Sequence, residues 1–216
     1  MISRLTLLWR PVLALGLAMI VTAMVASVTA TDVAQARQTL APVTAADRSI
    51  GRADAPVTVI EYASFACHHC ADWHQFVYPG FKTRFIDTGK VRFVFRNLPT
   101  DPQEISLPGA ALARCAVPER FFEVAAALMR GQSAVLRGGN REDWYGPAIA
   151  VSGRTQAQIE ACATSPAVEA ALARDMDSAE AAGVHSTPAF FVNGRQVTDR
   201  SLGGLEVAIR AATAGQ

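Results

Sequence analysis

The sequence has no concentration of charge of one sign. Its 216 residues include 20 lysines and arginines and 19 aspartates and glutamates, which gives a net charge of +1, and the basic residues form no run. A nucleic acid is therefore a poor candidate for a partner, because that binding depends on clustered positive charge. The sequence also lacks the glycine-rich fingerprints of nicotinamide, flavin and phosphate sites, so we expect no small cofactor.

Long apolar runs are missing too, except at the N-terminus. Arg4 and Arg10 accompany an uncharged apolar stretch (11–28), and small residues suited to cleavage follow at Val28-Thr-Ala30 and, with a better match, at Ala34-Gln-Ala36. This pattern is typical of a secretory signal peptide, which we place at residues 1–36. An uncleaved membrane anchor is the alternative, because the run is near the lower length limit for spanning a bilayer. In both cases we expect export to a compartment in which disulfides persist, the periplasm if the host is bacterial.

Cysteine is scarce, and the four cysteines form two different pairs. Cys67 and Cys70 make a C-x-x-C pair between a short β-branched run (57–62) and a run with helical spacing. At a helix N-terminus, unpaired N–H groups and the helix dipole favour the thiolate, which is the form that attacks disulfides. Cys115 and Cys162 are far apart in sequence, and in an exported protein we expect a structural disulfide between them. A second, regulatory redox pair is the alternative.

The periodicity predicts a β-α-β unit, a block of helices and a β-β-α unit. Residues 37–53 are expected to form a linker. Pro79-Gly80 should break or kink the first helix, and a second helical piece (81–86) should end at Gly89. Gly131 should end a later helix before a loop over 132–140. Asn193-Gly194 predicts a hairpin turn. The predicted strands are 57–62, 91–97, 189–193 and 196–198, and the predicted helices are 67–78, 106–117, 118–130, 141–151, 155–162, 166–183 and one that begins near 201.

Two segments together resemble the DsbA family of thioredoxin-fold thiol oxidases. The segment Glu61-Tyr-Ala-Ser-Phe-Ala-Cys-His-His-Cys70 is similar to the active-site segment of the family, and residues 184–194 resemble the segment with the cis-proline. The resemblance implies an α/β thioredoxin fold from residues 54–100 and 184–216, with an α-helical domain inserted at 101–183. It also implies a periplasmic thiol:disulfide oxidoreductase that introduces disulfides into exported proteins.

The resemblance assigns a role to each residue of the active-site segment. Cys67 would be the nucleophile, and Cys70 would resolve the mixed disulfide with a substrate. His69 matches the histidine that stabilises the nucleophilic thiolate, whereas His68 replaces the proline that is common in the family and would add a second imidazole to that stabilisation. Glu61 matches a buried acid that would accept the proton of Cys70; a strand-edge carboxylate facing water is the alternative.

The second segment would complete the site. Pro188 should be preceded by a cis peptide bond, which places the backbone of Thr187 beside the sulfurs, where an extended substrate can add as a strand. Thr187 takes the place of the valine that is usual in the strongest oxidases. The partners implied are reduced exported polypeptides and a membrane thiol oxidase that recycles the Cys67–Cys70 disulfide.

Two alternatives to an oxidase remain open on the sequence. One is a reductase or isomerase of the same fold, although no dimerisation domain is evident before Val57. The other is a periplasmic zinc or copper carrier, because Cys67, Cys70 and His74 with one more histidine would make a tetrahedral site. The histidines available are His68, His69, His74 and His185.

Overall fold

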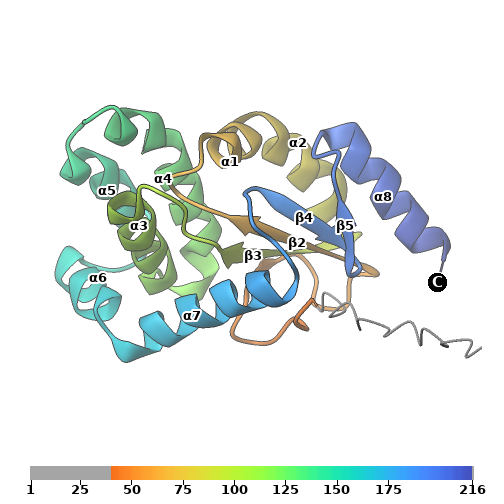
Figure 1. Ribbon diagram of the computed structural model, residues 1–216, viewed down its shortest axis with the longest axis horizontal. Helices are drawn as coiled ribbons and strands as arrows, with labels where there is room; N and C mark the ends of the chain where they lie inside the picture. Colours follow the sequence, from red (N-terminus) through yellow and green to blue (C-terminus); the bar gives the residue numbers. More distant parts are fainter. Residues whose placement is uncertain (1–39, 216) are drawn as a thin grey trace, which may run out of the picture. The chain divides into compact units, whose positions relative to one another are not determined.

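The computed structural model describes residues 40–215, and the predicted signal peptide lies outside this range. Five strands form one mixed sheet in the order β1-β3-β2-β4-β5 (Figure 1). The central strands β2 and β3 pair in parallel, and every other neighbouring pair is antiparallel. The strands are β1 (Arg48–Ile50), β2 (Val57–Ala63), β3 (Val91–Asn97), β4 (Ala189–Val192) and β5 (Arg195–Val197).

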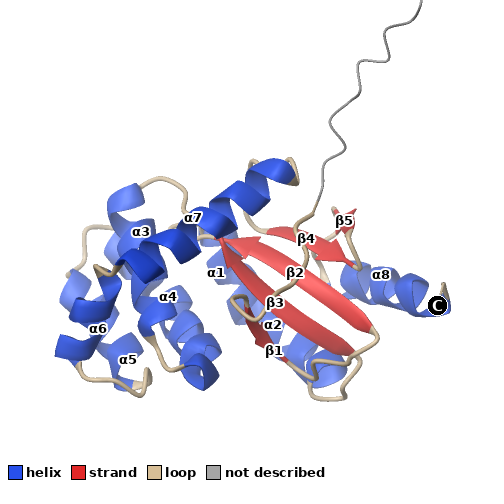
Figure 2. Ribbon diagram, turned by 90° about the horizontal axis from the view of Figure 1, so that it is seen from below, coloured by secondary structure: helices blue, strands red, loops and turns tan. Residues whose placement is uncertain are grey.

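Helices cover both faces of the sheet (Figure 2). Alternate residues of β2 face opposite layers: Val57 and Val59 pack with one set of helices, and Ile60 and Tyr62 pack against the other side. The first face carries α1 (His68–Asp72), η1 (Trp73–Val77), α2 (Tyr78–Phe81), η2 (Lys82–Ile86) and α8 (Leu202–Ala214). The second face is covered by α7 (Pro166–Ala181).

The helices between β3 and β4 form a domain with its own apolar core. They are α3 (Gln103–Cys115), η3 (Pro118–Arg120), α4 (Phe121–Leu136), α5 (Arg141–Ala150) and α6 (Gln156–Ala163), followed by α7. Phe65 and Phe95 extend this core to the end of the sheet, next to the start of α1. The order β-α-β, helical block, β-β-α confirms the predicted fold. Within residues 40–215, each helix falls short of the length or apolarity needed to cross a membrane.

The predicted linker at 37–53 is wrong where it meets the sheet. Residues Arg48–Ile50 form the edge strand β1, antiparallel to β3. A strand this short shows no period in the sequence, and polar contacts hold it in place. Asp47 accepts a hydrogen bond of 2.8 Å from Arg96, both nearly buried, and Arg48 donates one of 2.8 Å to the carbonyl of Arg114.

Of the predicted break or kink at Pro79-Gly80, the break does not occur, because the helical run continues through two π-helical turns. Pro79 lies in the first turn of α2, directly after the π-helical turn η1, and the wider turn accommodates the proline within the helical run. The wider turns keep Tyr78, Phe81 and Phe85 buried against the sheet together with Trp73. Helical residues therefore extend from His68 to Ile86.

The predicted helix end at Gly131 is also wrong, because α4 continues to Leu136. A Cβ atom on Gly131 would lie 2.6 Å from Cδ1 of Trp144, so this glycine makes room for an indole rather than ending the helix. Trp144 is buried, and its indole N–H donates a 2.7 Å hydrogen bond to the carbonyl of Leu128. Close packing of α4 on α5 thus overrides the local signal for a helix end.

Candidate active site

Cys67 is the N-cap residue of α1, as predicted for a C-x-x-C pair between a strand and a helix. Its backbone is extended, and its Sγ accepts a hydrogen bond of 3.3 Å from the N–H of Cys70. The sulfur therefore takes the position that a serine or aspartate oxygen occupies at an ordinary helix start. The side chain of Cys67 is partly exposed, whereas Cys70, one turn further, is fully buried.

The surroundings of Cys67 lower its pKa to about 6, from an ordinary value of 9.0. A hydrogen bond from the Cys70 thiol has the largest effect; partial burial opposes it, and hydrogen bonds from the Thr187 side chain and from the backbone N–H groups of Cys70 and His69 add to it. Most of Cys67 is therefore a thiolate at neutral pH.

Burial raises the pKa of the Cys70 thiol well above its ordinary value. The hydrogen bond that Cys70 donates to Cys67 acts in the same direction, and so do the negative charges of Cys67 and Glu61. The pKa values of the two thiols are thus shifted in opposite directions. At neutral pH Cys67 loses its proton, whereas Cys70 keeps its own.

His68 and His69 both point their rings away from the core. The two side chains are exposed, and their ring centroids are 3.9 Å apart. His69 acts on Cys67 through its backbone N–H, an effect that any residue at this position other than proline can supply. The stabilising role of the two imidazoles remains a prediction.

Glu61 lies on the central strand β2 with no solvent exposure, which excludes the alternative of a carboxylate facing water. Its Oε2 is 2.9 Å from Nε2 of His74, which is itself nearly buried, and its Oε1 makes no hydrogen bond. The sequence identifies Glu61 but groups His74 only with a possible metal site. The pair is not evident there because the two residues come from different elements, β2 and η1.

The segment before β4 approaches Cys67, as the resemblance implies. The Thr187–Pro188 peptide bond is cis, and the carbonyl oxygen of Thr187 lies 3.3 Å from Sγ of Cys67. Arg200 donates a 3.1 Å hydrogen bond to the carbonyl of Pro188, and the indole of Trp73 donates one of 2.9 Å to the carbonyl of Arg200. These contacts join the cis-proline segment to the helix that carries the cysteines.

Gln132 is a supporting residue that the sequence does not reveal. Its buried side-chain amide donates hydrogen bonds of 2.8 Å and 3.0 Å to the carbonyls of Phe65 and Cys67. The inserted domain thereby fixes the turn that presents Cys67. The available signal is a polar residue beside Gly131, in the stretch predicted to be a loop.

The geometry gives no support to the metal alternative. Within the described part of the chain, no three histidine, cysteine, aspartate or glutamate side chains come together as metal ligands would. His74 is occupied by Glu61, and His185 is exposed on the loop before Thr187.

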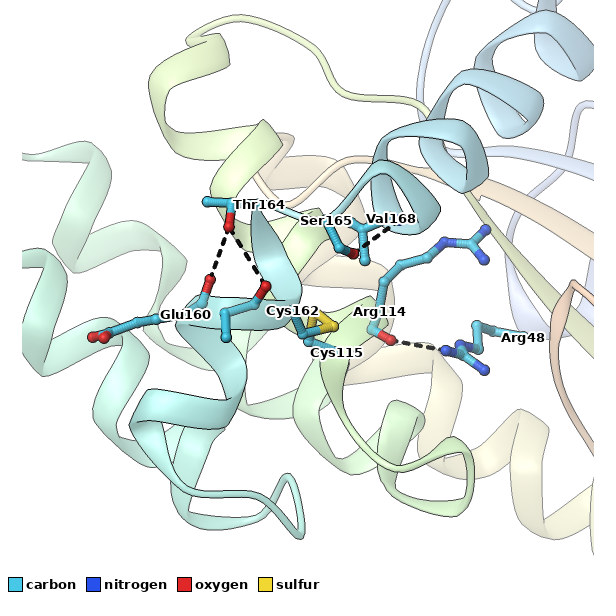
Figure 3. Close-up of a disulfide and its surroundings, with 9 residues drawn as sticks. Arg48, Arg114, Cys115, Glu160, Cys162, Thr164, Ser165 and Val168 are labelled. Carbon is cyan, nitrogen blue, oxygen red and sulfur yellow. Dashed lines mark hydrogen bonds between the residues drawn. A yellow bond between two sulfur atoms is a disulfide. The ribbon is translucent and has the colours of Figure 1, made fainter.

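Cys115 and Cys162 form a disulfide, the pairing expected from the sequence (Figure 3). It joins the end of α3 to α6, with a Cα–Cα distance of 5.8 Å. Cys115 is buried, and the carbonyl next to it, that of Arg114, accepts the hydrogen bond from Arg48 (Figure 3). The disulfide therefore ties together helices of the inserted domain and leaves Cys67 and Cys70 as a separate thiol pair.

Comparisons with known proteins agree with this geometry. The family model described as "Thioredoxin" matches residues 44–211. A curated relative from Rickettsia prowazekii, named "Putative protein-disulfide oxidoreductase", is 29% identical over 165 residues, which are 76% of this chain and 60% of the relative. The chain thus spans about 60% of the length of that relative. A "Probable disulfide bond formation protein D" of Bacillus cereus is 41% identical over 64 residues, 30% of each chain.

Solved structures share the same architecture. Alpha-DsbA1 of Wolbachia pipientis superposes with a TM-score of 0.71 at 25% identity, covering 82% of this chain and 94% of that one. BdbD of Bacillus subtilis superposes with a TM-score of 0.74 at 19% identity, covering 82% of this chain and 98% of that one. The chain belongs to the thioredoxin family, and the helical domain inserted into its sheet makes it a DsbA-like member of that family.

Proposed function

We propose that this protein is a thiol:disulfide oxidoreductase that introduces disulfides into exported polypeptides through Cys67 and Cys70. The observation that carries the proposal is the opposite tuning of the two thiols, with the pKa of Cys67 lowered to about 6 and that of Cys70 raised well above its ordinary value. The partly exposed sulfur is thus the reactive one, and the buried sulfur is reached only from within the protein.

The reaction begins with the Cys67–Cys70 disulfide. A substrate thiolate attacks Sγ of Cys67, the Cys67–Cys70 bond breaks, and Cys70 leaves as a thiolate that takes up a proton. A second substrate thiolate then attacks the substrate sulfur of the mixed disulfide, and Cys67 leaves as a thiolate. The substrate dithiol loses two electrons to become a disulfide, and the cysteine pair gains them.

The direction of electron flow follows from the state of Cys67. A thiolate that is stabilised in the reduced protein makes its disulfide more oxidising. With a pKa of about 6 in place of 9.0, the stabilisation at pH 7 is about 1.4 kcal/mol, or about 30 mV for a two-electron couple. The potentials of DsbA and thioredoxin differ by about 150 mV, so this effect favours the oxidase but supplies only part of that range.

The proposed substrates and partners follow the geometry and the family. The backbone of Thr187 lies against Cys67 and offers an extended polypeptide a site for strand pairing. The names of the relatives support action on protein disulfides. A membrane thiol oxidase that restores the Cys67–Cys70 disulfide, and a location in the periplasm after removal of the signal peptide, complete the proposal.

The test uses the purified protein with its thiol pair oxidised and a reduced model peptide with two cysteines. We expect the Cys67→Ser variant to lose all exchange. Because the Cys70→Ser variant cannot form the Cys67–Cys70 disulfide, it is given the peptide in its oxidised form, and its Cys67 thiolate should open the peptide disulfide and accumulate as a mixed disulfide, detected by mass spectrometry. Gln75→Ala, an exposed change on the same helical run, serves as the control and should react as the wild type does. Oxidation of the peptide by the Cys67→Ser variant would refute the proposal.

A further inference from the structure

The buried pair Glu61–His74 has a feature that packing alone does not require. Glu61 has no exposed side-chain surface, and one of its oxygens, Oε1, has no hydrogen-bond partner. A buried carboxylate oxygen without a partner is costly, and its retention calls for a functional explanation. The carboxylate is also close enough to Cys70 for its charge to raise the pKa of that thiol. One oxygen of Glu61 is therefore bound by His74, and the other is free to take a proton.

His74 differs from Glu61 in its access to solvent. The side chain of His74 is 3% exposed, against 0% for Glu61, so the imidazole is the member of the pair that reaches water. Its ring is held by Tyr78 at 5.2 Å and by Phe95 at 5.8 Å between centroids. The pair thus forms a fixed connection between a sealed carboxylate beside Cys70 and the solvent.

We propose that His74 is a positioning and proton-relay residue, which holds Glu61 beside Cys70 and carries protons between that carboxylate and water. The inference rests on the proposed function, because it concerns the same thiol exchange. The imidazole is suited to the task, since one ring nitrogen can release a proton while the other takes one up.

The relay acts when the disulfide of the protein is restored. In a mixed disulfide between Cys67 and an oxidising disulfide partner, the Cys70 thiol gives its proton to Glu61, and Glu61 passes a proton through His74 to water. The Cys70 thiolate attacks Sγ of Cys67, the bond between Cys67 and the partner sulfur breaks, and the partner leaves as a thiolate. The partner disulfide supplies the oxidising equivalents. During substrate oxidation, protons move in the opposite direction, to the Cys70 thiolate.

Among the neighbours of the pair that the structure identifies, none offers a second route for the proton of Cys70. The residues paired with Glu61 on β3 and β4 are Phe95 and Phe190, which cannot carry a proton. Tyr78 has a buried hydroxyl without a partner, but burial and the charge of Glu61 raise its pKa. Tyr78 therefore stays protonated and does not accept the proton of Cys70 at neutral pH.

The decisive variant is His74→Gln. Glutamine can still donate a hydrogen bond to Glu61 but cannot carry a proton, so it separates a relay from a structural anchor. The mixed disulfide of Cys67 with glutathione is prepared in the full chain, and its closure to Cys67–Cys70 is followed by acid trapping and mass spectrometry across pH. The pH dependence of Cys67 alkylation is measured in parallel, and Gln75→Ala is again the control.

We expect His74→Gln to slow closure by about 100-fold near neutral pH, with the loss shrinking at higher pH as hydroxide takes over, while the alkylation midpoint of Cys67 stays near 6. Glu61→Gln should show a similar loss, and the double variant should be no slower than Glu61→Gln alone, because the two residues act in series. Closure of His74→Gln with the wild-type pH profile would overturn the relay.

Two further outcomes are informative. If His74→Gln does not fold, Glu61→Gln decides the matter. Closure of the mixed disulfide at the wild-type rate in that variant would show that Glu61 is not the proton acceptor, and the relay depends on that acceptor. A wild-type protein whose Cys67 forms no mixed disulfide with oxidised glutathione would refute the proposed function, and the inference with it. Normal mixed-disulfide formation with unaltered closure in the variants would refute the inference alone.

Discussion

The midpoint potential of the Cys67–Cys70 couple should change its pH dependence near the pKa of Cys67. Reduction of the disulfide takes up two protons when both thiols are neutral, and one proton when Cys67 remains a thiolate. Each proton taken up in a two-electron reduction contributes about 30 mV per pH unit. The potential should therefore fall by about 60 mV per pH unit below pH 6 and by about 30 mV per unit above it.

The sign follows from the direction of the pKa shift. A lowered pKa stabilises the reduced, folded protein, and this stabilisation is complete above the ordinary value of 9.0 and is lost as the pH falls through about 6. The full shift corresponds to about 4 kcal/mol, or about 90 mV. Relative to a thiol with an ordinary pKa, such as glutathione, the protein should thus become more oxidising as the pH rises between these values.

The assay equilibrates the protein with glutathione buffers at each pH, quenches it with acid, alkylates the free thiols and counts them by mass spectrometry. The Cys115–Cys162 disulfide should stay oxidised throughout, which provides an internal control. A single slope of about 60 mV per pH unit up to about pH 8 would show that Cys67 has an ordinary pKa and would refute the reasoning.

Three further predictions concern stability. Replacing both Cys115 and Cys162 with alanine should lower the free energy of unfolding by about 4 kcal/mol on the chain-entropy model, measured by urea denaturation, while leaving the alkylation midpoint of Cys67 unchanged. Gly131→Ala should destabilise the protein by about 1–3 kcal/mol, because the added methyl group would collide with the indole of Trp144. The control is Gly146→Ala, which has open space around it in a helix and should be neutral or stabilising by up to about 1 kcal/mol. Equal effects of the two changes in thermal melts would contradict the packing argument. Gln132→Leu should cost about 1–3 kcal/mol, since the buried carbonyl of Phe65 loses its side-chain donor and that of Cys67 keeps only backbone donors, and an unchanged unfolding midpoint would argue against it.

The strands other than the edge strand β1, and the cysteine pair, could be predicted from the sequence because their signals are local. Val57–Ala63 and Val91–Asn97 are continuous apolar, β-branched runs, and Asn193-Gly194 has the positive φ angles that a tight hairpin requires. The placement of Cys67 at a helix start follows from the change of period at that residue. Each of these patterns is complete within about ten residues and needs no distant partner.

The features that the sequence did not predict depend on contacts between distant elements. A glycine such as Gly131 is locally typical of a helix end. It lies within α4 instead because it makes room for Trp144 on the next helix, a contact that the local sequence does not reveal. The same holds for Glu61, whose burial was expected but whose partner His74 comes from another element. A single sequence does not encode such pairings in its period, since they arise when the elements pack.

The π-helical turn η1 separates the active-site helix into two halves that differ in helical phase. A π turn holds about one residue more than an α turn, which corresponds to a rotation of about 100° between the helical segments on its two sides. Cys67 and Cys70 can thus pack against the core of the inserted domain while Phe81 and Phe85 remain in the apolar layer on the sheet. A change of length by one residue within Trp73–Val77 would turn the cysteines relative to their anchor, so the length of this segment is more tightly constrained than the identity of its exposed residues, Gln75 and Phe76.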